Sequence, residues 1–222
     1  MLTVENLNVE IEGTRVLRDL SLSLRSGVCT VLIGRNGAGK TTTLRSIMGL
    51  IPIVSGTFTM AGQEIQQLPA NKRAGLGIGY APEDRRLIPD FSIEENILLP
   101  MLALNLPVAE RKERLNQVYD FLPQLKEMRG RPGGGVSGGQ GKMVALGRAL
   151  TVADKILFLD EPFQGLAPAL ALEYARTLSR LRKYRPELAL LITESTPQLL
   201  REVADEELQI ERGEISQLAK AD

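Results

Sequence analysis

The sequence has no histidine, no tryptophan and only one cysteine among its 222 residues. Without histidine, any general base must be a carboxylate, and mechanisms that need an imidazole base, a His-ligated metal or a Cys–His pair are excluded. Cys29 has no partner for an internal disulfide, and its apolar neighbours indicate a small buried hydrophobe in a reducing compartment. Any chemistry must therefore rely on carboxylates, hydroxyl groups, cations and the backbone.

The sequence also lacks a net charge and a long hydrophobic run. Lys plus Arg and Asp plus Glu number 27 each, so no overall field draws the chain toward nucleic acid. The basic run at 180–185 is interpreted as a solvated helix end, where cations favour the macrodipole, and no nucleic-acid partner is expected. No run approaches the roughly 18 apolar residues of a membrane-spanning helix, and the N-terminal residues lack a signal-peptide pattern. The chain is expected not to cross a membrane by itself.

The length and the order of the sequence patterns predict one compact α/β domain. A chain of 222 residues can bury a large core without disulfides, and two full domains are not expected. Short apolar segments alternate with turns in the first and last thirds, whereas the middle third has a helical pattern from about Ile93. The predicted division is a single domain over 1–222, with a core at about 1–82 and 151–222 and a small helical subdomain at about 83–150.

Apolar spacing predicts individual strands and helices. Short strands are predicted at 28–33 and 76–80, and the runs at 156–159 and 188–192 are apolar throughout, as strands covered on both faces should be. Apolar residues three and four positions apart indicate helices around 115–122, 143–150 and 170–181. Two short strands around Arg212 and Gly213 are interpreted as a hairpin.

Residues 34–41 match the pattern G-x-x-x-x-G-K-[ST] at every fixed position. A strand pattern precedes this segment and a helical pattern follows it, so successive N–H groups can converge on an anion at a helix N-terminus. Lys40 is expected to reach the β- and γ-phosphates of a nucleotide, and Thr41 to ligate Mg²⁺. The residues predicted to hold the phosphates are Gly34, Arg35, Asn36, Gly37, Ala38, Gly39, Lys40, Thr41 and Thr42.

A second motif, at 155–162, is an apolar strand that ends in the adjacent carboxylates of Asp160 and Glu161. A nucleotide-hydrolysing site needs such a pair opposite its phosphate loop. Asp160 is expected to hold Mg²⁺ directly or through water. Glu161, which strand alternation would point the other way, is predicted to accept a proton from the attacking water. An Asp-Glu pair alone is common in turns, but after a phosphate loop it is a specific signal.

A third motif, VSGGQ at 136–140, resembles the LSGGQ signature of the ATP-binding-cassette (ABC) ATPases. Ser137 and the amides of Gly138 and Gly139 can form a second anion cradle at a helix N-terminus. The resemblance covers essentially the whole chain. It implies an α/β P-loop NTPase fold with a mixed β core, a small α-helical subdomain and an N-terminal antiparallel β part. It also implies that ATP and Mg²⁺ are bound, and that the segment from Ser137 to Gln140 serves the ATP of a facing subunit in a head-to-tail dimer.

Four positions depart from this family's pattern. Glu83 stands where the family presents a glutamine to Mg²⁺ and the permease, and it remains a candidate metal ligand and catalytic residue. Ile11 is the nearest match to the aromatic residue that stacks on adenine, so weakened stacking is expected. Ser195 replaces the switch histidine, and Ala167 stands where many relatives have aspartate. Because a serine hydroxyl is uncharged and, unlike histidine, cannot take up and release a proton at neutral pH, this chain's own site is expected to be slow, which favours pairing with a paralogue.

Residues 80–87 and 165–168 look like the branched-chain amino-acid importer branch, with the urea-importer ATPases as close neighbours. This resemblance implies an ATPase subunit of an ABC importer, peripheral on the cytoplasmic face of the plasma membrane. The implied partners are a second ABC ATPase subunit, identical or paralogous, integral-membrane permease subunits and, indirectly, a solute-binding protein.

Two other classes of function remain open from the sequence. One is a soluble ABC ATPase of cytoplasmic assembly, such as iron–sulfur cluster biogenesis, which the phosphate motifs do not exclude. The other is a nucleotide-gated binding module with little turnover, which Ser195 and the missing aromatic residue suggest. Co-purification with integral membrane proteins distinguishes the importer from the first, and measured ATP turnover distinguishes it from the second.

Overall fold

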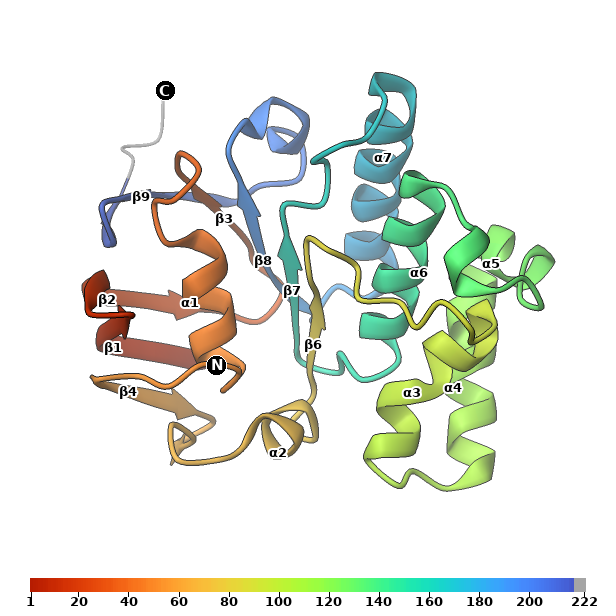
Figure 1. Ribbon diagram of the computed structural model, residues 1–222, viewed down its shortest axis with the longest axis horizontal. Helices are drawn as coiled ribbons and strands as arrows, with labels where there is room; N and C mark the ends of the chain where they lie inside the picture. Colours follow the sequence, from red (N-terminus) through yellow and green to blue (C-terminus); the bar gives the residue numbers. More distant parts are fainter. Residues whose placement is uncertain (218–222) are drawn as a thin grey trace.

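The computed structural model describes residues 1–217, whose strands form two sheets with helices packed around them (Figure 1). The first sheet is antiparallel, in the order β2-β1-β4-β5. The second has the order β10-β9-β3-β8-β7-β6, parallel from β9 to β6 with an antiparallel edge at β10. This mixed α/β architecture confirms the predicted fold class.

The strands are β1 (Leu2–Ile11), β2 (Thr14–Leu24), β3 (Cys29–Ile33), β4 (Ser55–Met60), β5 (Gln63–Glu64), β6 (Ile78–Ala81), β7 (Ile156–Asp160), β8 (Ala189–Glu194), β9 (Glu206–Glu211) and β10 (Glu214–Gln217). The helices are α1 (Lys40–Ile47), α2 (Ala70–Ala74), α3 (Ile93–Ala103), α4 (Val108–Phe121), α5 (Pro123–Glu127), α6 (Gly138–Leu150) and α7 (Pro168–Tyr184), with short 3₁₀ turns η1 (Gly133–Gly135) and η2 (Pro197–Leu200).

Strands β3, β7 and β8 are largely apolar because both faces of the second sheet are covered there. In β7, Leu157 and Leu159 pack into the core that contains α6 and α7, whereas Ile156 and Phe158 pack into the core shared with α1 and the first sheet. All four side chains are fully buried. The strands predicted at 28–33, 76–80, 156–159 and 188–192 correspond to β3, β6, β7 and β8.

The first two strands are longer than the short segments that the sequence predicts over residues 2–60. The register between β1 and β2 shifts at three places, and Asn6 and Asp19 adopt positive φ angles of 50° and 45°. Such bulges interrupt the period-two alternation by which a strand is recognised in sequence. The joining turn has positive φ at both Glu12 (49°) and Gly13 (76°), as a tight hairpin turn requires.

The hairpin predicted around Arg212 and Gly213 is confirmed, and it packs against the phosphate loop. Both residues have positive φ, 50° and 84°. The Gly213 N–H donates to the Ala38 carbonyl at 3.0 Å, and its carbonyl accepts from the Arg18 N–H at 3.0 Å. A Cβ added to Gly213 would lie 2.1 Å from the Val16 carbonyl oxygen, so only glycine allows this approach.

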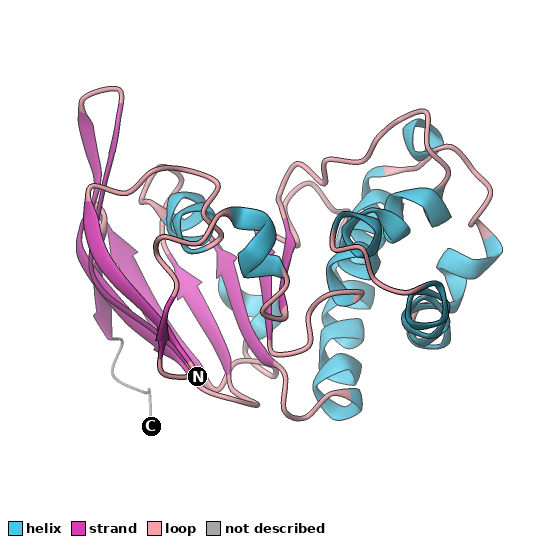
Figure 2. Cartoon of the chain, turned by 90° about the horizontal axis from the view of Figure 1, so that it is seen from below, coloured by secondary structure: helices cyan, strands magenta, loops and turns pink. Residues whose placement is uncertain are grey.

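Helices α3 to α6 form a helical lobe (residues 93–150) beside the sheets (Figure 2). Helix α6 lies closest to the second sheet, against β6. A Cβ added to Gly79 of β6 would lie 2.4 Å from the Ala149 carbonyl oxygen of α6, so the glycine permits the close approach. Within residues 1–217, no helix combines the length and the apolar character that crossing a membrane requires.

Arg73 of α2 is a buried cation that caps the far end of α1. Its Nη1 donates to the carbonyls of Ser46 (2.9 Å) and Ile47 (2.7 Å), its Nη2 to Gln66 (2.6 Å) and its Nε to Leu68 (2.8 Å). The first two are carbonyls in the last turn of α1, which lack partners within the helix. Arg73 therefore fixes the C-terminus of the helix that starts at the phosphate loop.

Replacing Arg73 with methionine is expected to lower the free energy of unfolding by about 3 kcal/mol, because several buried carbonyls lose a charged donor. Chemical denaturation of the full chain measures this change. Lys72→Met, at the exposed neighbouring position of α2, serves as the control and should change stability by less than about 0.5 kcal/mol. A loss below about 1 kcal/mol for Arg73→Met would contradict the capping role.

Candidate nucleotide-binding site

The predicted phosphate loop joins the carboxyl end of β3 to the start of α1. Gly37 and Gly39 have positive φ angles of 81° and 112°. A Cβ on Gly39 would lie 2.6 Å from Leu17 Cδ2, so a side chain does not fit there. Because α1 has no side-chain cap at its N-terminus, the N–H groups of its first turn are free to bind an anion.

Lys40 is buried at the centre of this site, with 4% of its surface exposed. Its Nζ donates to the carbonyls of Gly34 (2.7 Å) and Arg35 (3.1 Å) and lies 2.8 Å from Glu161 Oε1. The structure thus brings together two residues from separate sequence motifs. The Lys40 ammonium is therefore surrounded by oxygen atoms of the phosphate loop and of Glu161.

Asp160, at the end of β7, accepts hydrogen bonds from the phosphate loop and from the ends of β6 and β8. Its Oδ1 accepts hydrogen bonds from Thr41 Oγ1 (3.0 Å) and Thr193 Oγ1 (2.8 Å), and its Oδ2 accepts from the Tyr80 hydroxyl (3.0 Å). Burial and the adjacent Asp160 carboxylate raise the pKa of Tyr80, so the phenol remains a donor. The sequence analysis assigned no role to Tyr80 or Thr193. Their position at the carboxyl ends of β6 and β8 is the signal that could have found them.

Glu161 faces the site for a different reason from the strand alternation that the sequence suggests. It follows the last residue of β7 and adopts a positive φ of 44°, which turns the chain out of the strand. Its N–H donates to the carbonyl and the Oγ1 of Thr193, both at 3.1 Å. Only 7% of the Glu161 side chain is exposed to solvent. The left-handed turn, rather than the pleat, therefore sets the direction of the carboxylate.

Ser195 connects the phosphate loop to Glu161. Its Oγ accepts a hydrogen bond from Lys40 Nζ at 3.1 Å and lies 2.9 Å from both Asn36 Oδ1 and Glu161 Oε1. A hydroxyl has one proton, so Ser195 donates to one of these two oxygens at a time. Ser195, at the predicted switch position, therefore contacts both the phosphate loop and Glu161.

Acidic side chains from two further segments border the site. Glu83 lines one cavity together with Thr41 and Asp160, and partial burial together with the carboxylates of Asp160 and Glu161 raises its pKa. Glu194, at the end of β8, accepts from the Phe163 N–H at 3.0 Å, and burial raises its pKa to about 7. The concentration of negative charge is what a site for a divalent cation needs.

Comparison with known proteins identifies the family of this fold and site. The family model described as "ABC transporter" matches residues 17–164. The lipopolysaccharide export system ATP-binding protein LptB of Escherichia coli K12 is 34% identical over 194 residues, covering 87% of this chain and 79% of LptB. The probable branched-chain amino acid transport ATP-binding protein LivF of Archaeoglobus fulgidus is 33% identical, covering 92% of this chain and 86% of LivF. The chain belongs to the ABC transporter ATP-binding family.

Solved structures of ABC transporter subunits have the same fold. An ATP-binding subunit of an ABC transporter superposes with a TM-score of 0.83 at 26% identity, covering 98% of this chain and 90% of that one. The ADP conformation of an ATP-binding cassette gives a TM-score of 0.81 at 25% identity, with coverages of 97% and 89%. Members of this family hydrolyse ATP, and the chain is an ATP-binding subunit of an ABC transporter.

The ABC signature segment lies at the start of α6, in the helical lobe. Ser137 caps the helix: its Oγ accepts from the Gln140 N–H at 3.3 Å, and Gln140 Oε1 accepts from the Ser137 N–H at 3.0 Å. The Ser137 hydroxyl proton is left free to donate. None of the residues from Ser137 to Gln140 lines the two cavities beside the phosphate loop. Their predicted role toward a facing ATP stays a prediction.

Ile11 lies at the end of β1 and is 42% exposed. Its side chain belongs to neither of the two hydrophobic cores. The adenine contact proposed from its sequence position therefore stays a prediction.

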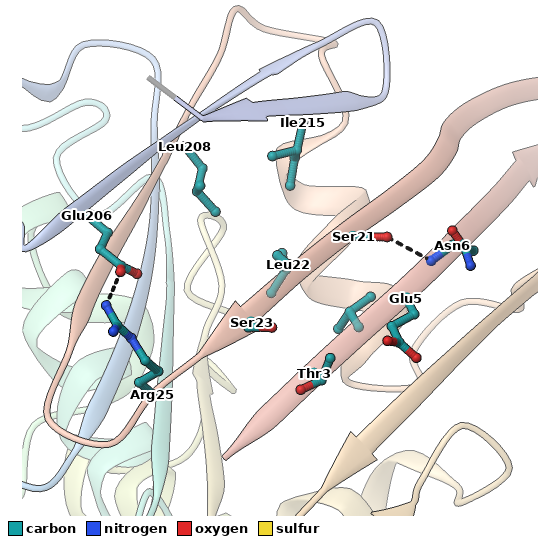
Figure 3. A pocket seen from close by; sticks show the side chains of 11 residues that line it. Thr3, Glu5, Asn6, Ser21, Leu22, Ser23, Arg25, Glu206, Leu208 and Ile215 are labelled. Carbon is teal, nitrogen blue, oxygen red and sulfur yellow. Dashed lines mark hydrogen bonds and ion pairs between the residues drawn. The ribbon is translucent and has the colours of Figure 1, made fainter. Parts of the chain in front are cut away.

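A separate cavity lies between the two sheets (Figure 3). The ion pair of Arg25 and Glu206 closes one end, and the Leu208 and Ile215 side chains point into the space. It is lined by parts of β1, β2, β9 and β10, and none of the predicted site residues borders it. The predicted nucleotide-binding residues therefore lie outside this cavity.

Proposed function

We propose that this chain is the ATP-hydrolysing subunit of an ABC importer for branched-chain or other hydrophobic amino acids. The observation that carries the hydrolytic assignment is the convergence of Lys40, Thr41, Asp160 and Glu161 at the carboxyl ends of β3 and β7. These residues come from two motifs that are far apart in the sequence. Across the two motifs, Lys40 lies 2.8 Å from Glu161 and Thr41 lies 3.0 Å from Asp160, as a site for phosphoryl transfer to water requires.

The residues present fit a nucleotide with Mg²⁺. Asp160 and Thr41 offer hard oxygen ligands 3.0 Å apart. Among residues 1–217, no group of three or more His, Cys, Asp and Glu side chains could hold a metal by itself. This agrees with the usual Mg²⁺ site of a nucleotide-hydrolysing enzyme, in which one or two carboxylates act together with substrate phosphates. When bound, the ion would neutralise charge on the β- and γ-phosphates.

In this proposal each residue has one task. Lys40 binds the β- and γ-phosphates, and the N–H groups at the start of α1 bind the same anion. Glu161 accepts a proton from the attacking water, a role supported by its position 2.8 Å from Lys40, the proposed phosphate ligand. Ser195 and Glu83 border the same reacting groups, with Ser195 as a hydrogen-bonding contact and Glu83 as a metal ligand.

We further propose that the chain acts as a single domain in a head-to-tail dimer. Ser137 to Gln140 would complete the ATP site of the facing subunit, because α6 presents free N–H groups and the Ser137 hydroxyl at its N-terminus. ABC ATPase subunits generally dimerise and work with membrane permeases. A permease complex would hold this subunit at the cytoplasmic face of the membrane.

The importer assignment is supported by two relatives with high coverage. LivF matches 92% of this chain, and the high-affinity branched-chain amino acid transport ATP-binding protein BraG of Pseudomonas aeruginosa is 31% identical over 97% of it. LptB, which is named for lipopolysaccharide export, is equally similar in sequence. Export of a lipid is therefore the second candidate, and urea import the third.

Uptake measurements in the source organism separate these candidates. Deleting the gene should reduce uptake of labelled leucine and leave urea uptake unchanged, and the wild-type chain should restore uptake whereas Lys40→Ala should not. The purified membrane complex should contain two permease subunits. Normal leucine uptake together with a defect in the outer membrane would favour lipid export, and recovery of soluble scaffold proteins would favour cytoplasmic assembly.

Discrimination between nucleotide bases is expected to be shallow. Ile11 offers only apolar contact, so most of the binding energy comes from phosphate and Mg²⁺ contacts that ATP and GTP share. In competition titrations, GTP should bind within about tenfold of ATP, which corresponds to roughly 1.4 kcal/mol. Ile11→Tyr should widen the gap in favour of ATP. A thousandfold preference for ATP in the wild type would mean that other residues read the base.

A further inference from the structure

A lysine of the signature helix reaches across to the main chain of the proposed catalytic base. Lys142 lies in the second turn of α6, and its Nζ donates to the Glu161 carbonyl oxygen at 2.7 Å. Only 7% of Lys142 is exposed. The contact joins the helical lobe to the loop after β7, so it bridges the two halves of the molecule.

Burying the Lys142 ammonium costs free energy of folding, so packing alone does not explain this residue. The neighbouring buried positions of α6, Met143, Val144 and Leu146, are apolar, and a methionine at 142 would fill similar space without a charge. Burial lowers the pKa of Lys142, and the nearby carboxylates of Glu83, Glu194 and Asp160 oppose that shift. A cation is therefore kept in a place where a hydrophobic side chain would stabilise the fold equally well or better.

The peptide that Lys142 holds is in a conformation that needs support. Glu161 has a φ of 44°, which is uncommon for a residue with a side chain. The N–H of Glu161 is fixed by Thr193 and its carbonyl by Lys142. With both sides of the residue held, the direction of its side chain is set, and the carboxylate lies 2.8 Å from Lys40.

We propose that Lys142 is a positioning residue that holds Glu161 in its left-handed conformation and thereby aims the catalytic carboxylate. The proposal rests on the role of Glu161 given above. Lys142 binds the main chain of Glu161, so its proposed effect on catalysis acts through Glu161. Because Lys142 belongs to α6, correct aim of the base depends on the helical lobe being docked against the sheet.

Steady-state ATP turnover and thermal melting of the full chain test this. Lys142→Met should lower kcat at least about tenfold, the loss expected for a charged hydrogen bond, with KM for ATP within about twofold. Its Tm should change little, because removing the buried charge offsets the loss of its hydrogen bond to the Glu161 carbonyl. Lys142→Gln should keep kcat within about threefold of wild type, because an amide still donates to the carbonyl. Lys126→Met, the same change at an exposed position of the helical lobe, is the control and should alter nothing.

A double variant separates this inference from the assignment of the base. If Glu161 is the base and Lys142 acts through it, adding Lys142→Met to Glu161→Gln should change residual turnover by less than about twofold. A Lys142→Met variant with wild-type kcat would overturn the inference. It would also be overturned if kcat fell together with Tm and fell equally far in Lys142→Gln, because the effect would then be a general loss of structure. If Glu161→Gln alone kept wild-type turnover, Glu161 would not be the base, and the inference about Lys142 would also be wrong.

Discussion

Lys40→Met is expected to weaken ATP binding at least about 100-fold and to lower Tm at the same time. The binding loss follows from removing the charged contact that Lys40 is predicted to make with the β- and γ-phosphates, which is worth about 3 kcal/mol. The loss of stability has a separate origin. Lys40 and Glu161 form a buried ion pair at 2.8 Å, so the variant leaves the Glu161 carboxylate without its partner. Breaking a buried pair costs about 3 kcal/mol or more, or roughly 6–12 °C in Tm for a chain of this size.

The double variant Lys40→Met/Glu161→Gln tells the two effects apart. Neutralising Glu161 removes the unpaired buried charge, so most of the lost Tm should return, whereas ATP binding should not. Isothermal titration and differential scanning calorimetry on both proteins provide the two readouts. ATP affinity that is unchanged in Lys40→Met would refute the assignment of the phosphate loop, and a Tm that does not recover would refute the ion pair as the source of the instability.

Glu161→Gln is expected to reduce ATP turnover by about 10²- to 10⁴-fold while ATP still binds. The amide preserves the shape of the side chain and its contacts with Lys40 and Ser195, which lie 2.8 and 2.9 Å from the carboxylate, but it cannot accept a proton from water. Because hydrolysis stops after binding, the variant should accumulate an ATP-dependent dimer. Light scattering at saturating Mg·ATP measures the dimer, and a phosphate-release assay measures turnover.

A control substitution at an exposed glutamate tests whether the effect is specific to Glu161. Glu127→Gln changes an exposed glutamate on α5 by the same atoms, and turnover should remain at the wild-type level. If Glu161→Gln hydrolyses ATP as fast as this control, the base lies elsewhere, and Glu83 or Glu194 becomes the next candidate because both carboxylates border the site. A Glu161→Gln protein that stays monomeric at saturating Mg·ATP would count against the head-to-tail dimer.

The sequence was sufficient for those parts of the site that are contiguous in the chain. The phosphate loop and the pair of Asp160 and Glu161 each lie in a short segment, and the chemistry they need is visible in the residue types and their spacing. Strands β3, β7 and β8 of the second sheet were also predictable, because burial on both faces leaves apolar runs. These parts depend on local composition alone.

The remaining parts of the site depend on contacts between distant segments. Thr193 and Tyr80, which hold Asp160, lie 33 and 80 residues from it in the chain. No local pattern distinguishes them from other strand residues. The left-handed turn at Glu161 was missed for a related reason, since its conformation is maintained by Lys142 and Thr193 and not by its own sequence. The bulges of β1 and β2 concealed the first hairpin in the same way.

The order of strands in the second sheet has a consequence for how the protein is made. β3, which carries the phosphate loop, pairs on one side with β8 and on the other with β9, and residue 213 packs on Ala38. Both neighbours are translated more than 150 residues after β3. A nascent chain can therefore form the first antiparallel hairpin early, but it cannot shape the loop until β8, β9 and the last hairpin have left the ribosome. ATP then stabilises only molecules in which these late strands are in place, so the nucleotide discriminates finished chains from truncated ones.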